Sequence, residues 1–271
     1  MSRYAAMFER CAAKKEGVFG AFLMLGDPEP GTSTAYLDAL VEGGADMVEL
    51  GIPFSDPVAD GPVIQAAAER ALAAGVRTDK CLSMIADFRA RHPSVPVGVL
   101  TYANIVAARG IERFADELAG AGADSLLVAD VPSLEAVPYA AAASKAGIDH
   151  VMIAAPNTPP ETLARIAALT TGYTYCVARP GVTGAGDRFD LDHSGLFARL
   201  ASAGAPPPIV GFGVSKPAHI SQALAQGAAG VICGSAIVSL IADRHPPPQV
   251  ADFVAAMKQA SRLPAEQMAS L

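Results

Sequence analysis

The sequence has little cysteine and no tryptophan, and its four cysteines lie far apart. They form no C-x-x-C pair and stand among apolar residues, at Cys11, Cys81, Cys176 and Cys233. Disulfide frameworks and zinc sites need closer, patterned spacing, so we expect reduced, buried thiols and a cytoplasmic protein. The chain also lacks an apolar run of roughly 18 residues and an apolar signal segment at its start, which predicts neither membrane insertion nor secretion.

Positive charge is also scarce, since 20 lysines and arginines face 27 aspartates and glutamates, for a net charge of -7. There is no basic cluster to attract a phosphate backbone or an anionic lipid surface, so we expect no nucleic-acid or membrane partner. Hydrophobic residues make up 51% of the 271 positions, enough to bury a large core. We therefore expect one domain spanning residues 1–271, because α/β barrels commonly reach this length as a single unit.

Short apolar runs recur along the chain, and their length and β-branched content are typical of buried parallel strands. The eight runs cover residues 18–25, 46–52, 95–102, 124–131, 150–156, 173–178, 208–214 and 229–234. Alanine-rich segments with helical spacing lie between them, and several end in a glycine turn such as "AGAD" at 121–124. The repeated unit is a strand followed by a helix.

Eight such units predict a (β/α)8 TIM barrel with an additional N-terminal helix over roughly the first 14 residues. A doubly wound open sheet is the alternative. It is disfavoured because the loop after the first strand, "LGDPEPGTS", has no G-x-G-x-x-G turn. In a barrel the active site lies at the carboxyl ends of the strands, so the chemistry is expected in the loops that follow them.

Lysine and histidine are missing from these strand ends. None of the six lysines falls in a predicted strand, which argues against a Schiff-base mechanism, and the five histidines are too dispersed to form a metal site. Carboxylates must then carry the acid–base chemistry.

Glu49 is the first candidate, because Val48, Leu50 and Ile52 surround it and an apolar environment raises the pKa of a carboxyl group. A paired or solvated strand-end acid is the alternative reading. Asp60 precedes "GPVIQAAAERAL" and is either a second functional acid or a helix-capping residue or the neighbour of one. Three further acids stand next to turn-forming residues and are expected to stabilise turns: Asp27, Asp56 and Asp130.

Glycine-rich turns follow the last two strands, in "GFGVS" at 211–215 and "CGSAI" at 233–237. Such turns stand at the start of helices, where no side chain covers the backbone N–H groups. The turns after the last two strands are the usual phosphate site of a barrel. The alternative is that these glycines only allow the chain to make tight turns. The loop 179–189 is longer than most strand–helix connections and is either a mobile lid or a simple flexible loop.

Aromatic and leucine side chains at the strand ends would together suit a flat aromatic substrate, although each alone could be core. They are Phe22, Leu100, Tyr102, Leu127, Tyr175 and Phe212.

Four long motifs resemble the alpha subunit family of tryptophan synthase: "ELGIPFSDPVADGP", "YTYCVARPGVTGA", "GFGVS" and "GSAIV". Further matches, "FLMLGDP", "LLVADVP" and "AAPNTP", extend the resemblance over nearly the whole chain. The resemblance implies retro-aldol cleavage of indole-3-glycerol phosphate to indole and D-glyceraldehyde 3-phosphate. It assigns proton transfer to Glu49 and stabilisation of the charged indole nitrogen to Asp60.

The same resemblance implies the binding residues. The phosphate ligands would be Gly184, Gly213, Gly234 and Ser235. The indole pocket would comprise Phe22, Leu100, Tyr102, Leu127, Tyr175 and Phe212, with Thr183 closing over the substrate and bonding Asp60.

The resemblance further implies a partner, the beta subunit, in an α2β2 complex that receives indole for L-tryptophan synthesis. Pyridoxal phosphate would belong to that partner, and this chain would carry no cofactor. Asp56, Pro53 and Pro57 would lie in the loop that meets the beta subunit. Two positions depart from the family pattern: Met24 replaces a small polar residue, commonly threonine, and Pro180 restricts the start of the loop 179–189.

Three other functions stay open from the residues. A flavin-dependent barrel would share the phosphate site, but it needs a cationic side chain near the flavin that the strand ends do not offer. A regulatory subunit that has lost catalysis is disfavoured by Glu49 and Asp60 and kept open by Met24. A stand-alone indole-releasing lyase would have the same site without a partner.

Overall fold

The computed structural model describes residues 1–177, 193–211 and 213–262. Their strands are β1 Val18–Met24, β2 Met47–Gly51, β3 Val97–Thr101, β4 Ser125–Val128, β5 Asp149–His150, β6 Ile153–Ala154, β7 Thr174–Val177, β8 Pro208–Gly211 and β9 Gly230–Cys233. Their helices are α1 Arg3–Lys14, α2 Pro30–Glu42, α3 Pro62–Ala73, α4 Thr78–Arg91, α5 Ala103–Arg109, α6 Ile111–Ala121, α7 Val137–Ala146, α8 Pro160–Leu169, α9 Ser194–Ser202, α10 Pro217–Ala225, α11 Ser235–Ala242 and α12 Pro247–Gln259.

All strand pairs are parallel, and the order of the sheet is β5-β4-β3-β2-β1-β9-β8-β7-β6. The two edges of this order, β5 and β6, are separated by only two residues of the chain. They are the two halves of the predicted fifth strand, the first paired with β4 and the second with β7. The sheet therefore curls into a ring with eight strand positions, and the predicted TIM barrel is confirmed while the open sheet is wrong.

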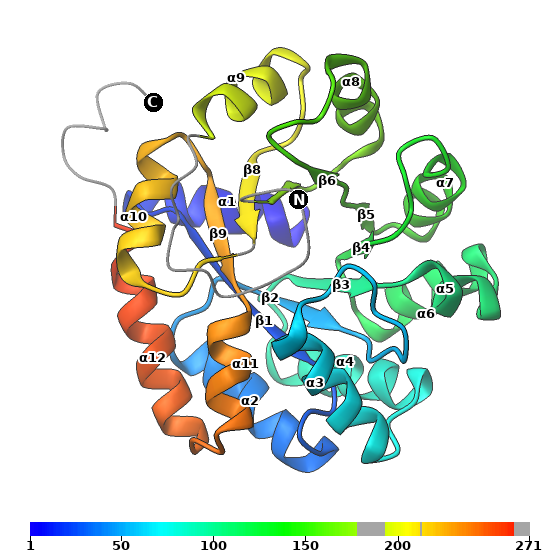
Figure 1. The fold of residues 1–271 in the computed structure, drawn as a ribbon, viewed down its shortest axis with the longest axis vertical. Coiled ribbons are helices and arrows are strands. Elements are labelled where there is room, and N and C mark those ends of the chain that lie inside the picture. The colour runs from blue at the N-terminus through cyan, green and yellow to red at the C-terminus, as the bar shows by residue number, and fades with distance from the viewer. Residues whose placement is uncertain (178–192, 212, 263–271) are drawn as a thin grey trace.

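The helices surround the strands, as Figure 1 shows. The glycine turns that were expected between helices and strands do end helices. Gly122 and Gly147 cap α6 and α7 with φ of 90° and 78°, a conformation that is energetically unfavourable for residues with a side chain. Each turn leads into a buried strand. Glycine at these positions thus sets where one βα unit ends and the next begins.

The expected N-terminal helix is α1, which lies behind the strands in Figure 1. Its Tyr4 is buried, shares a 2.8 Å hydrogen bond with the hydroxyl of Ser125, and packs against the ring of Tyr173 at 5.3 Å. Ser125 and Tyr173 stand where β4 and β7 begin. Helix α1 therefore closes the amino-terminal end of the barrel and leaves the carboxyl ends of the strands for a site.

None of the helices in the described residues is both long enough and apolar enough to cross a membrane.

Candidate active site

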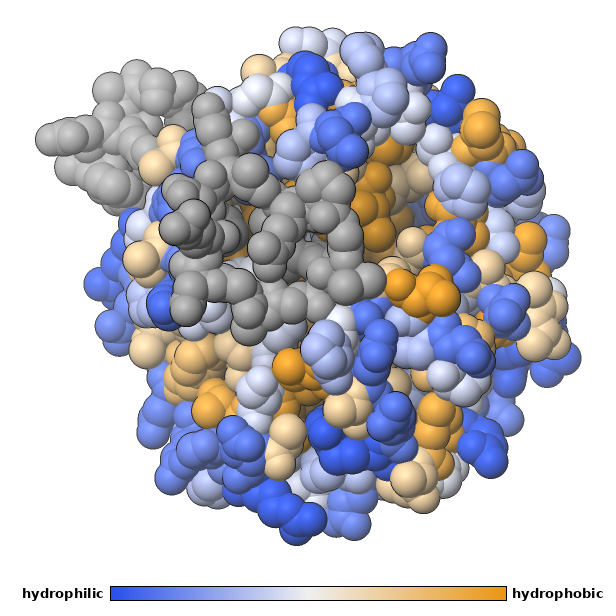
Figure 2. Space-filling model, in the orientation of Figure 1, coloured by the Kyte–Doolittle hydropathy of each residue, from blue (hydrophilic) through white to orange (hydrophobic). Residues whose placement is uncertain are grey.

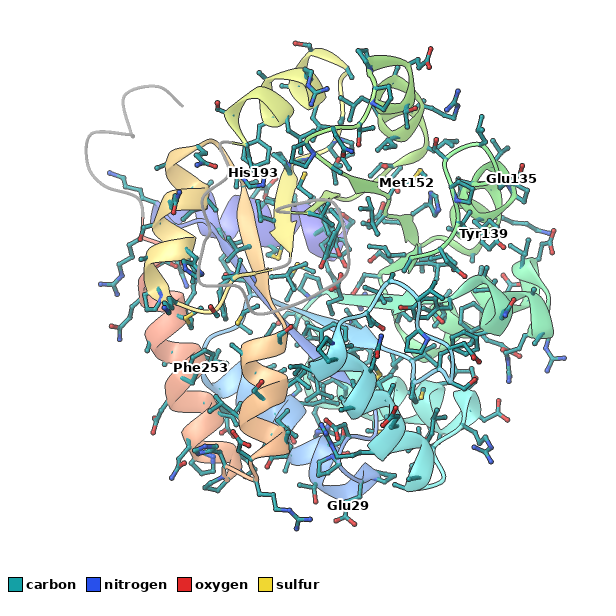
Figure 3. All side chains as sticks on the ribbon, viewed as in Figure 1. Glu29, Glu135, Tyr139, Met152, His193 and Phe253 are labelled. Atoms are coloured by element: carbon teal, nitrogen blue, oxygen red, sulfur yellow. The ribbon has the colours of Figure 1, made fainter. Side chains whose placement is uncertain are left out.

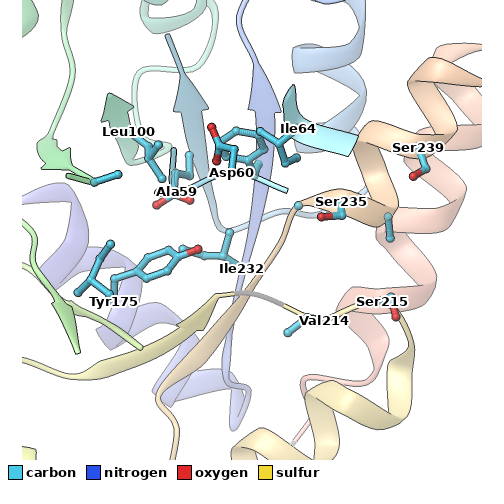
Figure 4. Close-up of a pocket in the computed structure, with 17 residues that line it drawn as sticks. Ala59, Asp60, Ile64, Leu100, Tyr175, Val214, Ser215, Ile232, Ser235 and Ser239 are labelled. Atoms are coloured by element: carbon cyan, nitrogen blue, oxygen red, sulfur yellow. The ribbon is translucent and has the colours of Figure 1, made fainter. Parts of the chain in front are cut away.

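A cavity lies at the carboxyl ends of the strands and brings together most of the predicted site residues (Figure 4). Predicted residues on its wall are Phe22, Glu49, Asp60, Leu100, Tyr175, Gly213, Gly234 and Ser235. These side chains come from segments far apart in the chain and meet because parallel strands bring their carboxyl ends to one rim. The wall includes both acids at one end and the two glycine turns at the other.

Glu49 occupies the middle of β2, in register with Phe22 on β1 and Gly98 on β3. The side chain is 1% exposed, and the hydroxyl of Tyr173 donates a 3.2 Å hydrogen bond to its Oε1. Burial raises the pKa of Glu49 to about 8, the Tyr173 bond opposes this shift, and the nearby charge of Asp60 adds to it. Glu49 is therefore predominantly protonated at neutral pH and can act as an acid.

Asp60 does not cap helix α3, whose N-cap is Gly61 and has no side-chain cap bond. Capping by Asp60 itself is therefore wrong, and Asp60 is the residue that neighbours the N-cap. The hydroxyl of Tyr102 donates a 2.8 Å hydrogen bond to Asp60 Oδ2, and Gln65 Nε2 donates one of 2.7 Å to the Asp60 carbonyl. These contacts hold the carboxylate against the cavity instead of turning it toward the helix.

The two acids differ in their titration. Burial raises the pKa of Asp60 to about 6 although the Tyr102 hydrogen bond opposes the rise, whereas the pKa of Glu49 reaches about 8. Between those values Glu49 keeps its proton and Asp60 has lost its own. A cavity with one neutral and one ionised carboxyl group can donate a proton at one point and stabilise positive charge at another.

The opposite end of the cavity consists of the turns before α10 and α11. It is lined by Gly213, Val214, Ser215, Gly234, Ser235, Ala236 and Ser239, and Figure 4 shows its serines apart from Asp60, Leu100 and Tyr175. Gly213 has a φ of 76°, which a residue with a side chain adopts only at a cost. Backbone N–H groups at the start of a helix favour an anion, although the N–H of Ser215 already donates to His219 Nδ1 at 3.3 Å.

Several predicted residues lie elsewhere. Tyr102 contacts the site through Asp60, and Leu127 is 2% exposed in the hydrophobic core and not on the cavity wall. Thr183, Gly184 and Phe212 lie outside the described residues, as does the predicted lid.

The acids for which turn roles were predicted have clear structural partners. Asp27 accepts two hydrogen bonds from Arg70, of 2.7 and 2.8 Å, and so ties the loop after β1 to α3. Asp130 Oδ1 accepts a 2.8 Å hydrogen bond from the backbone N–H of Ala103, at the start of α5. Neither residue lines the cavity.

Sequence reasoning missed Tyr173, the partner of Glu49, although a signal was present. Tyr173 and Tyr175 stand two residues apart in "YTYCVA", and alternate residues of a strand face the same side. It also missed apolar wall residues, among them Ile64, Ala129, Ile153 and Ile232. Those side chains have no local pattern that separates them from other core residues.

Met24, one of the two departures from the family pattern, is buried beside Gly51. A Cβ atom on Gly51 would come within 2.8 Å of Phe22 Cζ and 3.1 Å of both Met24 Sδ and Met24 Cε. The missing side chain of Gly51 therefore gives room to Phe22 and Met24. Pro180, the other departure, lies outside the described residues.

The described residues contain no group of three or more histidine, cysteine, aspartate or glutamate side chains able to hold a metal ion.

Comparison with known proteins identifies the family. The model of the family described as tryptophan synthase alpha chain matches residues 8–267. The tryptophan synthase alpha chain of Aeromonas salmonicida is 49% identical over 266 residues, covering 96% of this chain and 99% of the relative. That of Vibrio cholerae El Tor Inaba N16961 is 47% identical over 268 residues, covering 97% and 100%.

A solved structure of Mycobacterium tuberculosis tryptophan synthase contains a chain with a TM-score of 0.88 and 33% identity, covering 97% of this chain and 99% of that one. Sequence and fold agree in pointing to one group of proteins. The chain belongs to the tryptophan synthase alpha chain family.

Proposed function

We propose that the chain cleaves indole-3-glycerol phosphate by a retro-aldol reaction to indole and D-glyceraldehyde 3-phosphate. The observation that carries the proposal is the polarity of one cavity, with two buried acids at its aromatic end and two glycine turns at its other end. The substrate has the same polarity, because it joins an indole ring to a phosphate through a short polyol. The ring would lie between Phe22, Leu100 and Tyr175, and the phosphate against Gly213, Gly234 and Ser235.

The reaction needs one proton to be added and another to be removed. Protonation of indole C3 by Glu49 gives a cationic ring with its charge at nitrogen, and Glu49 becomes a carboxylate. That carboxylate then takes the proton of the side-chain hydroxyl next to the scissile bond. The C–C bond breaks, its electron pair returns to the ring, and indole and an aldehyde form with Glu49 protonated again.

Asp60 would accept a hydrogen bond from the indole N–H and stabilise the cation between these steps. Its pKa of about 6 keeps it ionised at neutral pH, and Tyr102 leaves one carboxylate oxygen for the ligand. Both steps are proton transfers that carboxyl groups perform by themselves. We therefore propose that this subunit needs no cofactor and that pyridoxal phosphate belongs to the partner.

We further propose a beta subunit as the partner, in an α2β2 complex that converts the released indole to L-tryptophan. Three large apolar side chains are exposed beside the cavity rim: Val58 in the loop after β2, Leu134 after β4 and Val137 at the start of α7, at 69%, 71% and 56%. A contiguous patch of exposed apolar groups marks an interaction surface, and we propose that these residues belong to one. Phe54, Asp56, Pro57 and Val58 line a hollow in the same loop, which a partner could fill.

The four buried free cysteines suit a reducing compartment, which supports a cytoplasmic location.

The test is the rate of indole formation from indole-3-glycerol phosphate by the purified chain, alone and with a cognate beta subunit. The proposal expects a slow rate that the partner increases and that Glu49→Gln abolishes. A fast rate without the partner would indicate a stand-alone lyase. No indole under either condition would refute the reaction and support a regulatory subunit.

A further inference from the structure

A second cavity of about 270 Å³ lies in the wall of the barrel, between β4, the β5–β6 segment, α7 and α8. It exists because the fifth strand changes partner. Asp149 and His150 pair with β4, the N–H of Val151 still bonds Leu126 at 3.0 Å, and then Ile153 pairs with Tyr175 on β7. Beyond Leu126 the two segments diverge, and the space between them is not filled by side chains.

The walls of this second cavity are largely apolar. They comprise Val128, Ala129, Val131, Pro132, Ser133, Ala136, His150, Val151, Met152, Ile153, Thr158, Thr162 and Ile166. Figure 2 shows a recessed hydrophobic area between α7 and α8, and Figure 3 labels Met152 beside it. Among the described residues that line the cavity there is no lysine, arginine or acid, so its wall favours a neutral molecule over a charged one.

His150 adds a hydrogen-bond acceptor to this wall, beside the hydroxyl groups of Ser133, Thr158 and Thr162. Its side chain is 95% buried, and burial lowers the pKa of the imidazole, so the ring is neutral. Nδ1 lies 2.9 Å from the carbonyl of Leu169, which can only accept, and so Nδ1 carries the proton. Nε2 is then an acceptor, and it has no hydrogen-bond partner among the described residues.

The second cavity adjoins the main one. Ala129 and Ile153 line both, so a thin apolar wall separates the aromatic end of the candidate active site from the space beside His150. A neutral molecule released at that end would meet this wall first. Both residues are small or aliphatic, and neither has a charge that would oppose passage.

We propose that this second cavity binds a small, neutral aromatic molecule that carries one N–H donor, and that its occupant is indole. The flat ring would contact the aliphatic wall, and its N–H would donate to His150 Nε2. The choice of indole rests on the proposed function, which produces indole next to the shared wall. The binding itself depends only on the chemistry of the cavity.

Methyl NMR of the chain with [13C]methyl-labelled methionine tests the proposal, because Met152 lies in the second cavity and Met24 lies beside Phe22 of the main one. The main cavity is first saturated with indole-3-propanol phosphate, which lacks the hydroxyl groups needed for cleavage. Indole is then titrated. The proposal expects the Met152 methyl signal to shift in a saturable way while the Met24 signal stays where the analogue left it.

Two substitutions sharpen the result. His150→Phe keeps a ring and removes the acceptor, and it should weaken indole binding by about 3- to 10-fold, the range for one hydrogen bond. Thr162→Phe fills the cavity from α8 and should abolish the shift. Ala164→Phe adds the same ring to the exposed side of α8 and should leave the titration unchanged. Unfolding midpoints of all three variants confirm that they are folded.

The proposal is overturned if Met152 does not respond to indole at millimolar concentration, or if Thr162→Phe responds like the unsubstituted chain. Its failure can be told from that of the proposed function, because the titration measures binding without turnover. A chain that cleaves the substrate but shows no Met152 shift would retain its function and lose this second site. A chain that binds indole beside Met152 but does not produce indole from indole-3-glycerol phosphate would keep this second site and lose the proposed function.

Discussion

The two ends of the main cavity use different parts of the chain. At one end, Glu49 and Asp60 act through side chains whose pKa values depend on burial and on Tyr173 and Tyr102. At the other end, Gly213 and Gly234 contribute no side chain, and the turns before α10 and α11 offer backbone N–H groups. The comparison teaches that substitutions should affect the chemical step at the first end and substrate binding at the second.

The largest effect is expected for Glu49→Gln, which keeps the shape of the side chain and removes its proton chemistry. We expect kcat to fall by at least about 100- to 10,000-fold, the usual contribution of a general acid–base. The affinity for indole-3-propanol phosphate should stay within about 3-fold, a change smaller than one hydrogen bond would produce. Kinetics of indole release and calorimetric titration measure the two quantities. An equal loss of kcat and of affinity would show that the two ends of the cavity do not separate chemistry from binding.

The same substitution should change how stability depends on pH. The pKa of Glu49 is raised from 4.5 to about 8 in the folded state, so between these values the folded chain keeps a proton that the unfolded chain has lost. Unfolding then releases a proton, and the contribution of Glu49 to stability falls as pH rises through this window. Above about pH 8, Glu49→Gln should be more stable than the unsubstituted chain by roughly 2–4 kcal/mol.

Urea unfolding at a series of pH values checks this expectation. Below the ordinary pKa of glutamate, 4.5, the ionisation penalty is absent and this difference should vanish. A gap between the two proteins that is constant with pH would show that the pKa of Glu49 is not raised by folding.

At the other end, Ser235→Asp places a carboxylate at the first residue of α11, on the cavity wall. Repulsion of the substrate phosphate should raise KM by about 10- to 100-fold, as expected for like charges near a protein surface. Ser235→Ala, the neutral control, should raise it by about 10-fold at most. Steady-state kinetics would contradict the comparison if kcat fell while KM stayed constant.

The smallest effect is expected for Tyr102→Phe, which removes the hydrogen bond that lowers the pKa of Asp60. The pKa of Asp60 should rise, and the acid limb of the kcat/KM profile should move up by about one pH unit. Tyr36→Phe removes a tyrosine hydroxyl that bonds the carbonyl of His245, and it should leave this limb in place. An unchanged profile in Tyr102→Phe would show that Asp60 titrates without influence from Tyr102.

Much of the barrel can be predicted from the sequence, because its strands and helices have local signals. The apolar runs contain the strands, and glycines such as Gly122 and Gly147 mark the helix ends by a backbone conformation that few other residues adopt. Asp60 was harder to assign, since Asp before Gly-Pro suits a helix cap equally well. The N-cap at Gly61 and the bond from Tyr102, which lies 42 residues further along the chain, distinguish the two roles.

The sequence by itself determined that Glu49 lies in an apolar strand segment, and that glycine turns follow the last strands. Both properties follow from neighbouring residues. The tertiary structure decided that Tyr173 contacts Glu49, and that the fifth strand leaves β4 for β7 and places His150 on the wall of a cavity. Those contacts depend on how the ring of strands closes, since register and closure set which distant residues meet and no local pattern encodes them.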